Sequence, residues 1–389
     1  MQRQLYKSPI VAKTLVLTAF VTAFIGGIEP TQSLEPYQYK TSPSHEVLDQ
    51  VVDNIMTPYV RRNAFAGVVL VADGPQTAHS KAYGEVIPGD GIQHQVNSEW
   101  RWASVTKMVA GLLVMQEIEG GRLSLDQVVS SLLPQAPDHF KTVTLRQLMN
   151  HTSGLANPDQ TEIDSTTGVY EWASASVPNF AYCYGPPLAE AGSRFDYNAC
   201  DFIVLADILK TITGQDFQSL VKTRITERYS LDSIKVVTDV QDDAEIVGTK
   251  HGKPVNDGLK LANLSADAAI VGKPTDLLKL TQLFMADEII TDAVLKREFG
   301  RGIPEFGQVA LTVWGYKATL TGCKEPVDII ERQGHLPGTK ILTLQAPDLR
   351  RSIVLFSNRE ETDWGWIWQE YGLSYTLASE VFCRPKTYS

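Results

Sequence analysis

The stretch RWASVTKMVAGLLVMQEIEGG, residues 101–121, carries the most informative pattern in the chain. Its apolar residues recur at helical spacing, and its Gly-Gly end is typical of a helix C-terminus. Two polar residues, Ser104 and Lys107, stand in the first turn of this apolar helix and share one of its faces. A capping serine with a lysine that extends to solvent would explain the pair structurally. A nucleophile beside its base would explain it chemically.

A second Ser-x-x-Lys pattern, Ser219 and Lys222, lies in DFQSLVKTRITERY. This stretch predicts an amphipathic helix, and both residues fall on its polar face. We therefore interpret the second copy as structural and the first as a candidate site.

Composition limits the class of protein before any residue is assigned a role. The chain has 389 residues, 43% of them hydrophobic and 21% charged, with a formal net charge of -10. This composition is typical of a globular protein with one large domain or two modest ones. The negative charge, with no stripe of Lys and Arg, argues against nucleic acid as a partner.

The N-terminus resembles an export signal. Three basic residues precede an uncharged apolar run, residues 14–28, and Thr31-Gln32-Ser33 is an acceptable small-x-small cleavage site. The run is short for a membrane span. We expect a signal peptide over 1–33, a flexible leader over 34–44, a periplasmic or secreted protein, and no stable membrane span once the signal is removed.

Four cysteines remain after the expected cleavage, and an even number in an exported protein suggests two disulfides. Three pairings are possible. We favour Cys183–Cys200, which are close in sequence, and Cys323–Cys383, which would tie the C-terminal tail to a strand. The seven histidines are scattered, and there is no Cys-x-x-Cys, so we predict neither a metal site nor a cofactor.

Strand patterns occur near both ends of the chain, and helical patterns fill the middle. The predicted strands are 64–73, 78–86, 311–320, 326–334, 340–346 and 351–358; the clearest predicted helices besides 101–121 are 45–60, 201–214 and 363–382. This order predicts an α/β (α+β) fold, with one antiparallel sheet built from N- and C-terminal segments and flanked by helices.

The same order predicts the domain organisation. We expect a single catalytic domain over 45–385. Its α/β lobe would comprise about 45–121 and 256–385, and an inserted all-helical lobe would cover about 122–255.

Five segments, in this order, resemble the serine β-lactamase and penicillin-binding-protein superfamily. They are RWASVTKMVAGLLV, TLRQLMNHTSGL, FDYNACDFIVLADILKTITG, SADAAIVGKPTDLLKL and ERQGHLPG. The resemblance covers most of 45–385 and is closest to class C β-lactamases, D-alanyl-D-alanine carboxypeptidases and related esterases. It is far more specific than Ser-x-x-Lys alone. It implies a serine hydrolase that acts through a covalent acyl-enzyme.

The resemblance and the chemistry of the residues together suggest catalytic roles. Ser104 would attack a carbonyl, favoured by the positive end of its helix. Lys107 and Tyr197, the tyrosine of FDYNAC, would handle protons. The backbone N–H groups of Ser104 and His335 would form an oxyanion hole.

The segment RQG fills the third motif of the family and supplies further substrate-binding candidates: Arg332, Gln333 and Gly334. Arg332 would attract a substrate carboxylate or hold Tyr197 electrostatically. Gly334 would let substrate backbone approach the strand closely. The structural alternative for Arg332 is a solvated charge at a strand edge.

Two departures from the family pattern bear on the substrate. The family's Tyr-x-Asn is Tyr197-Asn198-Ala199 here, so the asparagine that orients the lysine and the substrate amide is missing. Asn198, one position earlier, is kept as a substrate-binding candidate. The third motif has arginine instead of lysine or histidine. Both changes argue against efficient β-lactam hydrolysis.

We therefore expect hydrolysis of an ester, a D-amino-acid peptide or a β-lactam, taken as a small molecule or a peptidoglycan-derived fragment. Esterase or D,D-peptidase-like activity is favoured over true β-lactamase activity. The alternative is a non-catalytic protein on the same fold that holds a cell-wall fragment or a partner.

Overall fold

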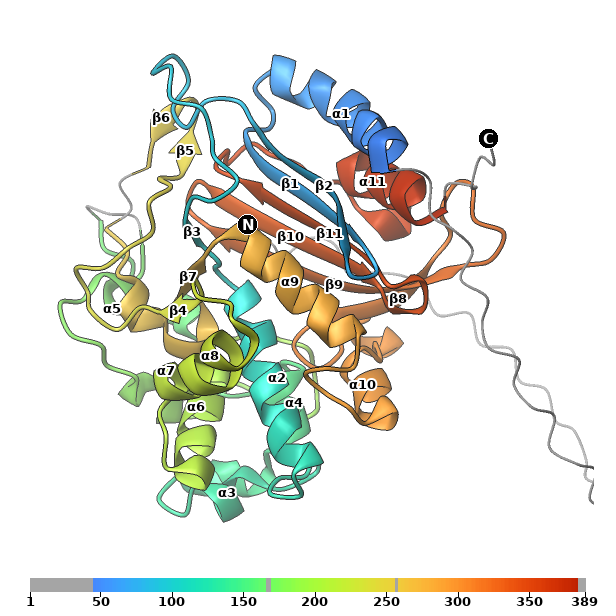
Figure 1. Ribbon diagram of the computed structural model, residues 1–389. Helices are drawn as coiled ribbons and strands as arrows, with labels where there is room; N and C mark the ends of the chain where they lie inside the picture. Colours follow the sequence, from blue (N-terminus) through green and yellow to red (C-terminus); the bar gives the residue numbers. More distant parts are fainter. Residues whose placement is uncertain (1–44, 166–168, 256–257, 384–389) are drawn as a thin grey trace, which may run out of the picture. The chain divides into compact units, whose positions relative to one another are not determined.

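A six-stranded antiparallel sheet joins the two ends of the described chain (Figure 1). The computed structural model describes residues 45–165, 169–255 and 258–383. The sheet order is β2-β1-β11-β10-β9-β8. The strands are β1 Gly67–Asp73, β2 Gln76–Tyr83, β8 Trp314–Ala318, β9 Val327–Leu336, β10 Thr339–Ala346 and β11 Arg351–Ser357. The first strand, β1, pairs with the last, β11, from Gly67–Ser357 to Asp73–Arg351, so one sheet is built from both ends of the chain, as the sequence pattern predicts.

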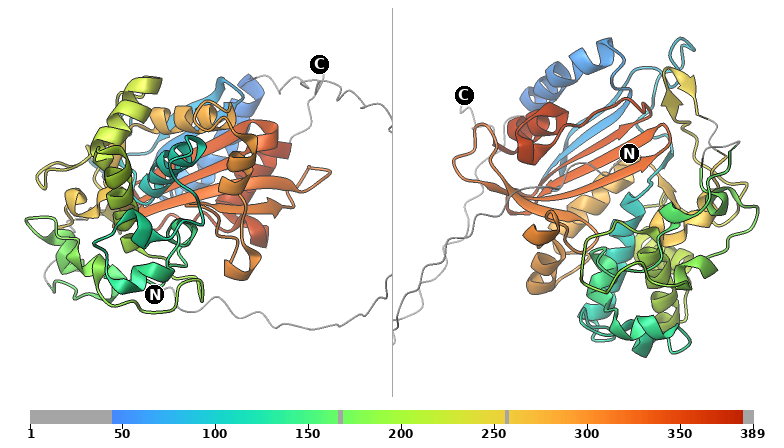
Figure 2. Two further views of the ribbon diagram at one scale, coloured as in Figure 1. Left: turned by 90° about the horizontal axis from the view of Figure 1, so that it is seen from below. Right: turned by 180° about the vertical axis from the view of Figure 1, so that it is seen from behind.

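Helices cover both faces of this sheet, as the two further views also show (Figure 2). On one face lie α1 (His45–Arg61) and α11 (Gly372–Cys383), and on the other lie α2 (Val105–Glu119) and α9 (Pro274–Met285). In β1, Val69 and Val71 pack into the core on the side of α1 and α11. Val68 and Leu70 pack into the core on the side of α2 and α9. Because both faces are buried, β1 is a continuous apolar run without alternation.

Helix α2, which carries Ser104 at its start, lies between the sheet and the helical lobe. It contacts β9 on one side and α6 (Ala199–Thr213) on the other. Since nearly the whole helix is buried, its apolar residues cover all sides and not only one stripe.

The other helices and strands are short, and most of them lie in the inserted lobe. The remaining helices are α3 Val129–Leu132, α4 Leu145–Met149, α5 Glu171–Ser174, α7 Phe217–Val221, α8 Glu227–Tyr229 and α10 Ala293–Phe299. Segments of 3-10 helix are η1 Asp138–Thr142, η2 Pro158–Gln160, η3 Ala181–Tyr184, η5 Leu261–Asp267, η6 Pro304–Phe306, η7 Pro347–Leu349 and η8 Ile367–Gln369, of which η5 is kinked at Ser265; η4 Lys222–Thr226 is a π-helical turn. The short strands are β3 Trp100–Arg101, β4 Lys235–Val236, β5 Thr249–Lys250, β6 Lys253–Pro254 and β7 Ile270–Gly272.

Two expectations about helices are therefore wrong. The region 122–255 is not all-helical: β4 in the lobe pairs with β7, which also pairs with β3. The final helix begins at Gly372 and not near 363. Gly365 and Gly372 have φ of 70° and 94°, and a Cβ on Gly365 would lie 2.5 Å from the Gly372 Cα. The chain closes a tight loop there, which a helix cannot do.

Both expected disulfides are present. Cys183 and Cys200 link η3 to the first turn of α6, with their Cα atoms 5.0 Å apart. Cys323 and Cys383 link the segment after β8 to the end of α11, with Cα atoms 4.6 Å apart.

Within the described ranges, no helix has the length and apolar character needed to cross a membrane. The signal peptide and leader expected over 1–44 lie outside the described residues, as do the last two residues of the expected domain.

Candidate active site

Ser104 is the N-cap residue of α2, but its hydroxyl does not cap the helix. Its side chain makes no capping hydrogen bond. It accepts a hydrogen bond from Lys107 Nζ at 3.1 Å. The capping interpretation therefore fails, and the hydroxyl stands at the positive end of an apolar helix with backbone N–H groups beside it.

Lys107 is a buried ammonium with all its protons in use. Its side chain is 1% exposed, so it does not extend to solvent. Besides Ser104 Oγ, Nζ donates to the backbone oxygen of Asp267 at 3.2 Å and to its carboxylate. An ammonium has three protons and no acceptor, so in this arrangement Lys107 donates to Ser104 and has no lone pair for the serine proton.

Asp267 was not predicted from the sequence. It ends η5, and 160 residues separate it from Lys107. The segment SADAAIVGKPTDLLKL, matched to the family, contains it, but no spacing rule singles out this carboxylate.

Tyr197 lies where a phenol can exchange a proton with Ser104. Its hydroxyl accepts from Arg332 Nη2 at 2.6 Å. Burial acts to raise the pKa of Tyr197, but the charges of Arg332 and Lys107 and a hydrogen bond with Ser104 outweigh it, so the pKa lies below its ordinary value of 10.0. The structure thus brings together the serine, the lysine and the tyrosine that were predicted.

Arg332 serves Tyr197 and the start of α2. Its guanidinium donates to three oxygens: Ser104 O at 2.7 Å, Thr312 O at 2.9 Å and the Tyr197 hydroxyl. It is 1% exposed. Of the two predicted roles, holding Tyr197 agrees with this geometry, whereas capture of a substrate carboxylate does not, because the guanidinium is buried and three of its five N–H donors are used internally. The solvated-charge alternative is also wrong.

Gly334 makes room for the start of α2. A Cβ at this position would lie 2.6 Å from the Trp102 backbone oxygen and 3.2 Å from the Ala103 side chain. The absence of a side chain therefore lets β9 and the start of α2 approach each other.

Gln333 and His335 point their side chains to the opposite face of the sheet, since alternate residues of a strand face opposite sides. Gln333 Nε2 donates to Glu331 at 2.6 Å, and the His335 ring contacts Glu360 at 3.1 Å. The prediction that the Gln333 side chain binds substrate is therefore not supported by its position.

The backbone of β9 has a free edge beside Ser104. Strand β8 pairs with β9 only as far as Trp314–Glu331. The Arg332 backbone oxygen faces β10, where Thr343 Oγ1 donates to it at 3.4 Å. Because backbone groups alternate in direction along a strand, the N–H of His335, three residues on, is directed to the free edge. This orientation is the one that an oxyanion hole requires.

Asn198 is a helix cap and does not face a substrate. Its buried side chain accepts from Cys200 N at 2.8 Å and donates to the oxygens of Leu155 and Ala156, at 3.2 and 2.9 Å. All its polar atoms are therefore used at the start of α6, and its assignment as a substrate-binding residue is corrected.

A buried His151–Asp201 pair supports Tyr197 and was also missed. The His151 and Tyr197 ring centroids are 4.4 Å apart. His151 Nδ1 accepts the Asn198 N–H at 3.1 Å and lies 3.0 Å from Asp201 Oδ2. Since Nδ1 is an acceptor, the shared proton belongs to Asp201, whose pKa burial raises well above 3.8.

Strained backbone surrounds these side chains. Ala103, His151, Ser265 and Thr312 have φ of 49°, 59°, 46° and 71°, in the left-handed region. Such conformations cost on the order of 1–3 kcal/mol each and persist where the surrounding structure enforces them, typically at functional sites.

The second Ser-x-x-Lys pattern is structural, as predicted. The Lys222 side chain is 69% exposed and lies 3.7 Å from Glu227. Ser219 donates its backbone N–H to Asp216, which caps α7.

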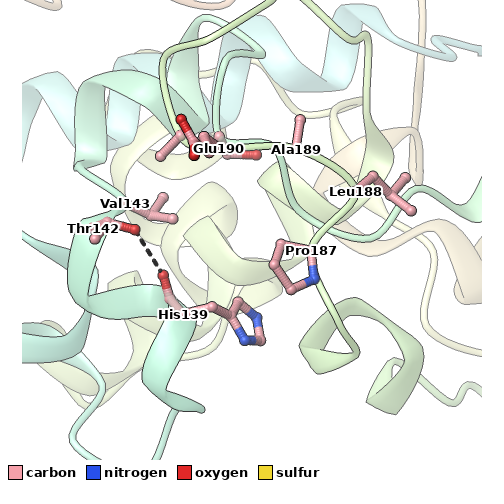
Figure 3. A pocket seen from close by; sticks show the side chains of 9 residues that line it. His139, Thr142, Val143, Pro187, Leu188, Ala189 and Glu190 are labelled. Carbon is pink, nitrogen blue, oxygen red and sulfur yellow. Dashed lines mark hydrogen bonds between the residues drawn. The ribbon is translucent and has the colours of Figure 1, made fainter.

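A pocket of about 310 Å³ lies between η1 and the segment 187–191 (Figure 3). Thr142 Oγ1 donates to the His139 backbone oxygen at its wall, at 3.1 Å. None of Ser104, Lys107 and Tyr197 lines it, so we assign it no catalytic role. In the part of the chain that the structure describes, no group of three or more His, Cys, Asp or Glu is placed to hold a metal ion.

Comparisons with known proteins agree with this geometry. A family model described as Beta-lactamase matches residues 48–366. Penicillin-binding protein 4* of Bacillus subtilis (strain 168) is 22% identical over 325 residues, which are 77% of this chain and 69% of that protein. The D-alanyl-D-alanine-carboxypeptidase/endopeptidase AmpH of Escherichia coli (strain K12) is 24% identical over 249 residues, 62% of each protein, so the match spans less than two thirds of AmpH.

A solved structure shows the same fold. The D-amino acid amidase of Ochrobactrum anthropi SV3, complexed with D-phenylalanine, matches with a TM-score of 0.71 at 16% identity, covering 87% of this chain and all of that one. Together with the family match over most of the chain, this fold shows that the protein belongs to the Beta-lactamase family of serine hydrolases.

Proposed function

We propose that the protein is an exported hydrolase in which Ser104 is acylated by an ester or by a D-amino-acid amide or peptide. One observation supports the proposal above all: the Ser104 hydroxyl does not cap its helix and lies between a fully committed lysine ammonium and a tyrosine whose pKa is lowered. Export is supported by the two disulfides, which persist in oxidising compartments.

The proposed first step transfers the serine proton to Tyr197. Ser104 Oγ bonds to the substrate carbonyl carbon as its proton passes to the Tyr197 oxygen, and the backbone N–H groups of Ser104 and His335 hold the oxyanion. The leaving group departs with the proton from Tyr197. Water then attacks the acyl-enzyme by the same route in reverse and releases the acid and free Ser104. Lys107 stays charged and stabilises the tyrosine in its deprotonated form.

The relatives suggest the acyl group. AmpH is named as a D-alanyl-D-alanine carboxypeptidase, and the structural match as a D-amino acid amidase. A D-amino acid derivative or a simple ester therefore fits better than a β-lactam, because Ala199 lacks the family's asparagine amide. A peptidoglycan-derived fragment is one source of such a group.

A fluorophosphonate probe tests this function, because it labels only an activated serine. We expect labelling of the wild type and of Ser219→Ala, but not of Ser104→Ala. Ser219→Ala is the matched control, since it removes the serine of the other Ser-x-x-Lys pattern. An unlabelled but folded wild type would favour the alternative, a non-catalytic protein that holds a cell-wall fragment or partner.

A further inference from the structure

Asp267 presents an accessible acceptor next to the candidate nucleophile. One carboxylate oxygen pairs with Lys107, which in turn donates to Ser104. The other oxygen has no hydrogen-bond or ion-pair partner among the described residues, and the side chain is 11% exposed. Asp267 is thus one residue removed from Ser104 through Lys107, and it keeps a carboxylate oxygen that still requires a donor.

The cations of the site are not available to a substrate. Lys107 and Arg332 are each 1% exposed. All three Lys107 protons and three of the five Arg332 N–H donors are used by protein oxygens. Of the charged side chains around Ser104 described above, Asp267 is thus the one that offers its charge to solvent, and that charge is negative.

The site also lacks the donor that an acylated amine would use. Position 199 has alanine where the family has an asparagine amide. Asn198 cannot replace it, because its amide donates to the Leu155 and Ala156 carbonyls. The carbonyl oxygen of an N-acyl group thus finds no amide donor at this position, and Asp267 repels it.

Two further polar atoms without partners among the described residues lie on η3 and on η5, the element that ends at Asp267. The Tyr182 hydroxyl is buried without a partner among the described residues, and it lies close enough that, after burial, the Asp267 charge raises the pKa of Tyr182. In η5, Asn263 donates to the Ala173 and Ala175 oxygens, at 3.3 and 2.8 Å, which leaves its own buried carbonyl oxygen unpaired. The unpaired Asp267 and Asn263 oxygens can only accept, and the Tyr182 oxygen can accept as well, which suits a ligand that only donates.

We propose that Asp267 binds the protonated amine of substrates whose amino group is adjacent to the acyl carbonyl, and that the enzyme therefore prefers free amino-acid esters and amides to N-acylated ones. An alkylammonium carries three protons and no acceptor, which complements these oxygens. The inference rests on the proposed function, since it takes Ser104 as the nucleophile. Asp267 is a specificity residue that also positions Lys107.

A pair of matched substrates tests the inference. D-alanine p-nitroanilide and N-acetyl-D-alanine p-nitroanilide share the acyl group and the leaving group, and they differ at the amine, which is a charged donor in the first and a neutral acetamide in the second. We expect the wild-type kcat/KM to favour the free amine, and Asp267→Asn to lower that preference by about tenfold to a hundredfold, the range for a lost hydrogen bond to a charged group. The readout is the ratio of kcat/KM for the free amine to kcat/KM for the N-acetyl substrate. The ratio is used because Asp267→Asn also removes the partner of Lys107 and so lowers kcat/KM for both substrates.

Two further variants keep the test specific. Asp328→Asn removes an equal charge from a half-exposed carboxylate that pairs with Lys317, and should leave the preference unchanged. Ala199→Asn restores an amide donor and should raise kcat/KM for the N-acetyl substrate more than for the free amine. Thermal melts check folding.

The possible outcomes separate the two proposals. A wild type that hydrolyses both substrates equally, or prefers the N-acetyl one, overturns the role of Asp267 even if Asp267→Asn does not fold. So does an unchanged preference in folded Asp267→Asn. If neither substrate, nor p-nitrophenyl acetate, nor the fluorophosphonate acylates Ser104, the proposed function itself is wrong.

Discussion

Replacing Arg332 by methionine should separate its electrostatic role from its structural one. Methionine keeps much of the volume but removes the charge and the three hydrogen bonds, including the one of 2.6 Å to Tyr197. A hydrogen bond to a charged group contributes about 1.5–3 kcal/mol, so labelling of Ser104 should slow roughly ten- to 150-fold at neutral pH. Two buried backbone oxygens also lose their donor, at about 1–3 kcal/mol of unfolding free energy each.

The pH dependence of activity shows in which direction Arg332 shifts the pKa of Tyr197. In the proposed mechanism Tyr197 acts as a base when deprotonated, so activity should be present above its pKa and lost as the pH falls through that pKa. Arg332 lowers the pKa of Tyr197, and removing its charge raises that pKa. The acid side of the activity profile should therefore move to higher pH in Arg332→Met. Arg332→Lys retains the charge, so its profile should move less, although one ammonium cannot reach all three oxygens.

The assay is the second-order rate of fluorophosphonate labelling between about pH 5 and pH 9, followed by intact mass, with a thermal melt for each variant. A folded Arg332→Met whose acid limb coincides with that of the wild type would show that Arg332 does not tune Tyr197. A lysine variant that shifts as far as the methionine variant would show that geometry, and not charge, controls the tyrosine.

Three further results are expected. Gly334→Ala should melt at lower temperature and lose labelling, since its Cβ would lie 2.6 Å from the Trp102 backbone oxygen. Such overpacking costs about 1–3 kcal/mol of unfolding free energy. A variant with wild-type labelling and stability would refute the close approach of β9 and α2. Asp201 is buried and its pKa lies well above 3.8, so its neutral form costs stability as the pH rises above that value. Asp201→Asn retains the donor and acceptor of the neutral acid, and its melting temperature minus that of the wild type should increase with pH; a constant difference would mean that Asp201 is ionised. Replacing Cys183 and Cys200 by serine opens a link between residues 17 apart and should cost roughly 3 kcal/mol, read from urea unfolding of oxidised protein; unchanged stability would show that the bond does not form.

Features that depend on neighbours in the chain were predictable. The continuous apolar run in β1 and the apolar pattern of α2 follow from local periodicity, and the structure places both elements where the pattern predicts them. Ser104 and Lys107 are one turn apart, so helix geometry alone brings them together. The prediction of a helix over 363–371 was wrong because Gly365 and Gly372 face each other and close a loop. A helical apolar pattern does not exclude such a loop.

The remaining features depend on which distant segments meet. Lys107 has an ion-pair partner 160 residues away, and nothing local to Asp267 indicates it. Periodicity shows that Arg332 and Gln333 face opposite sides of β9, but not which side holds Ser104. That follows from the packing of α2 on one face and of α1 and α11 on the other. Arg332 therefore holds Tyr197 and Gln333 does not contact the site, because the side on which a strand's residues function is set by what packs against it.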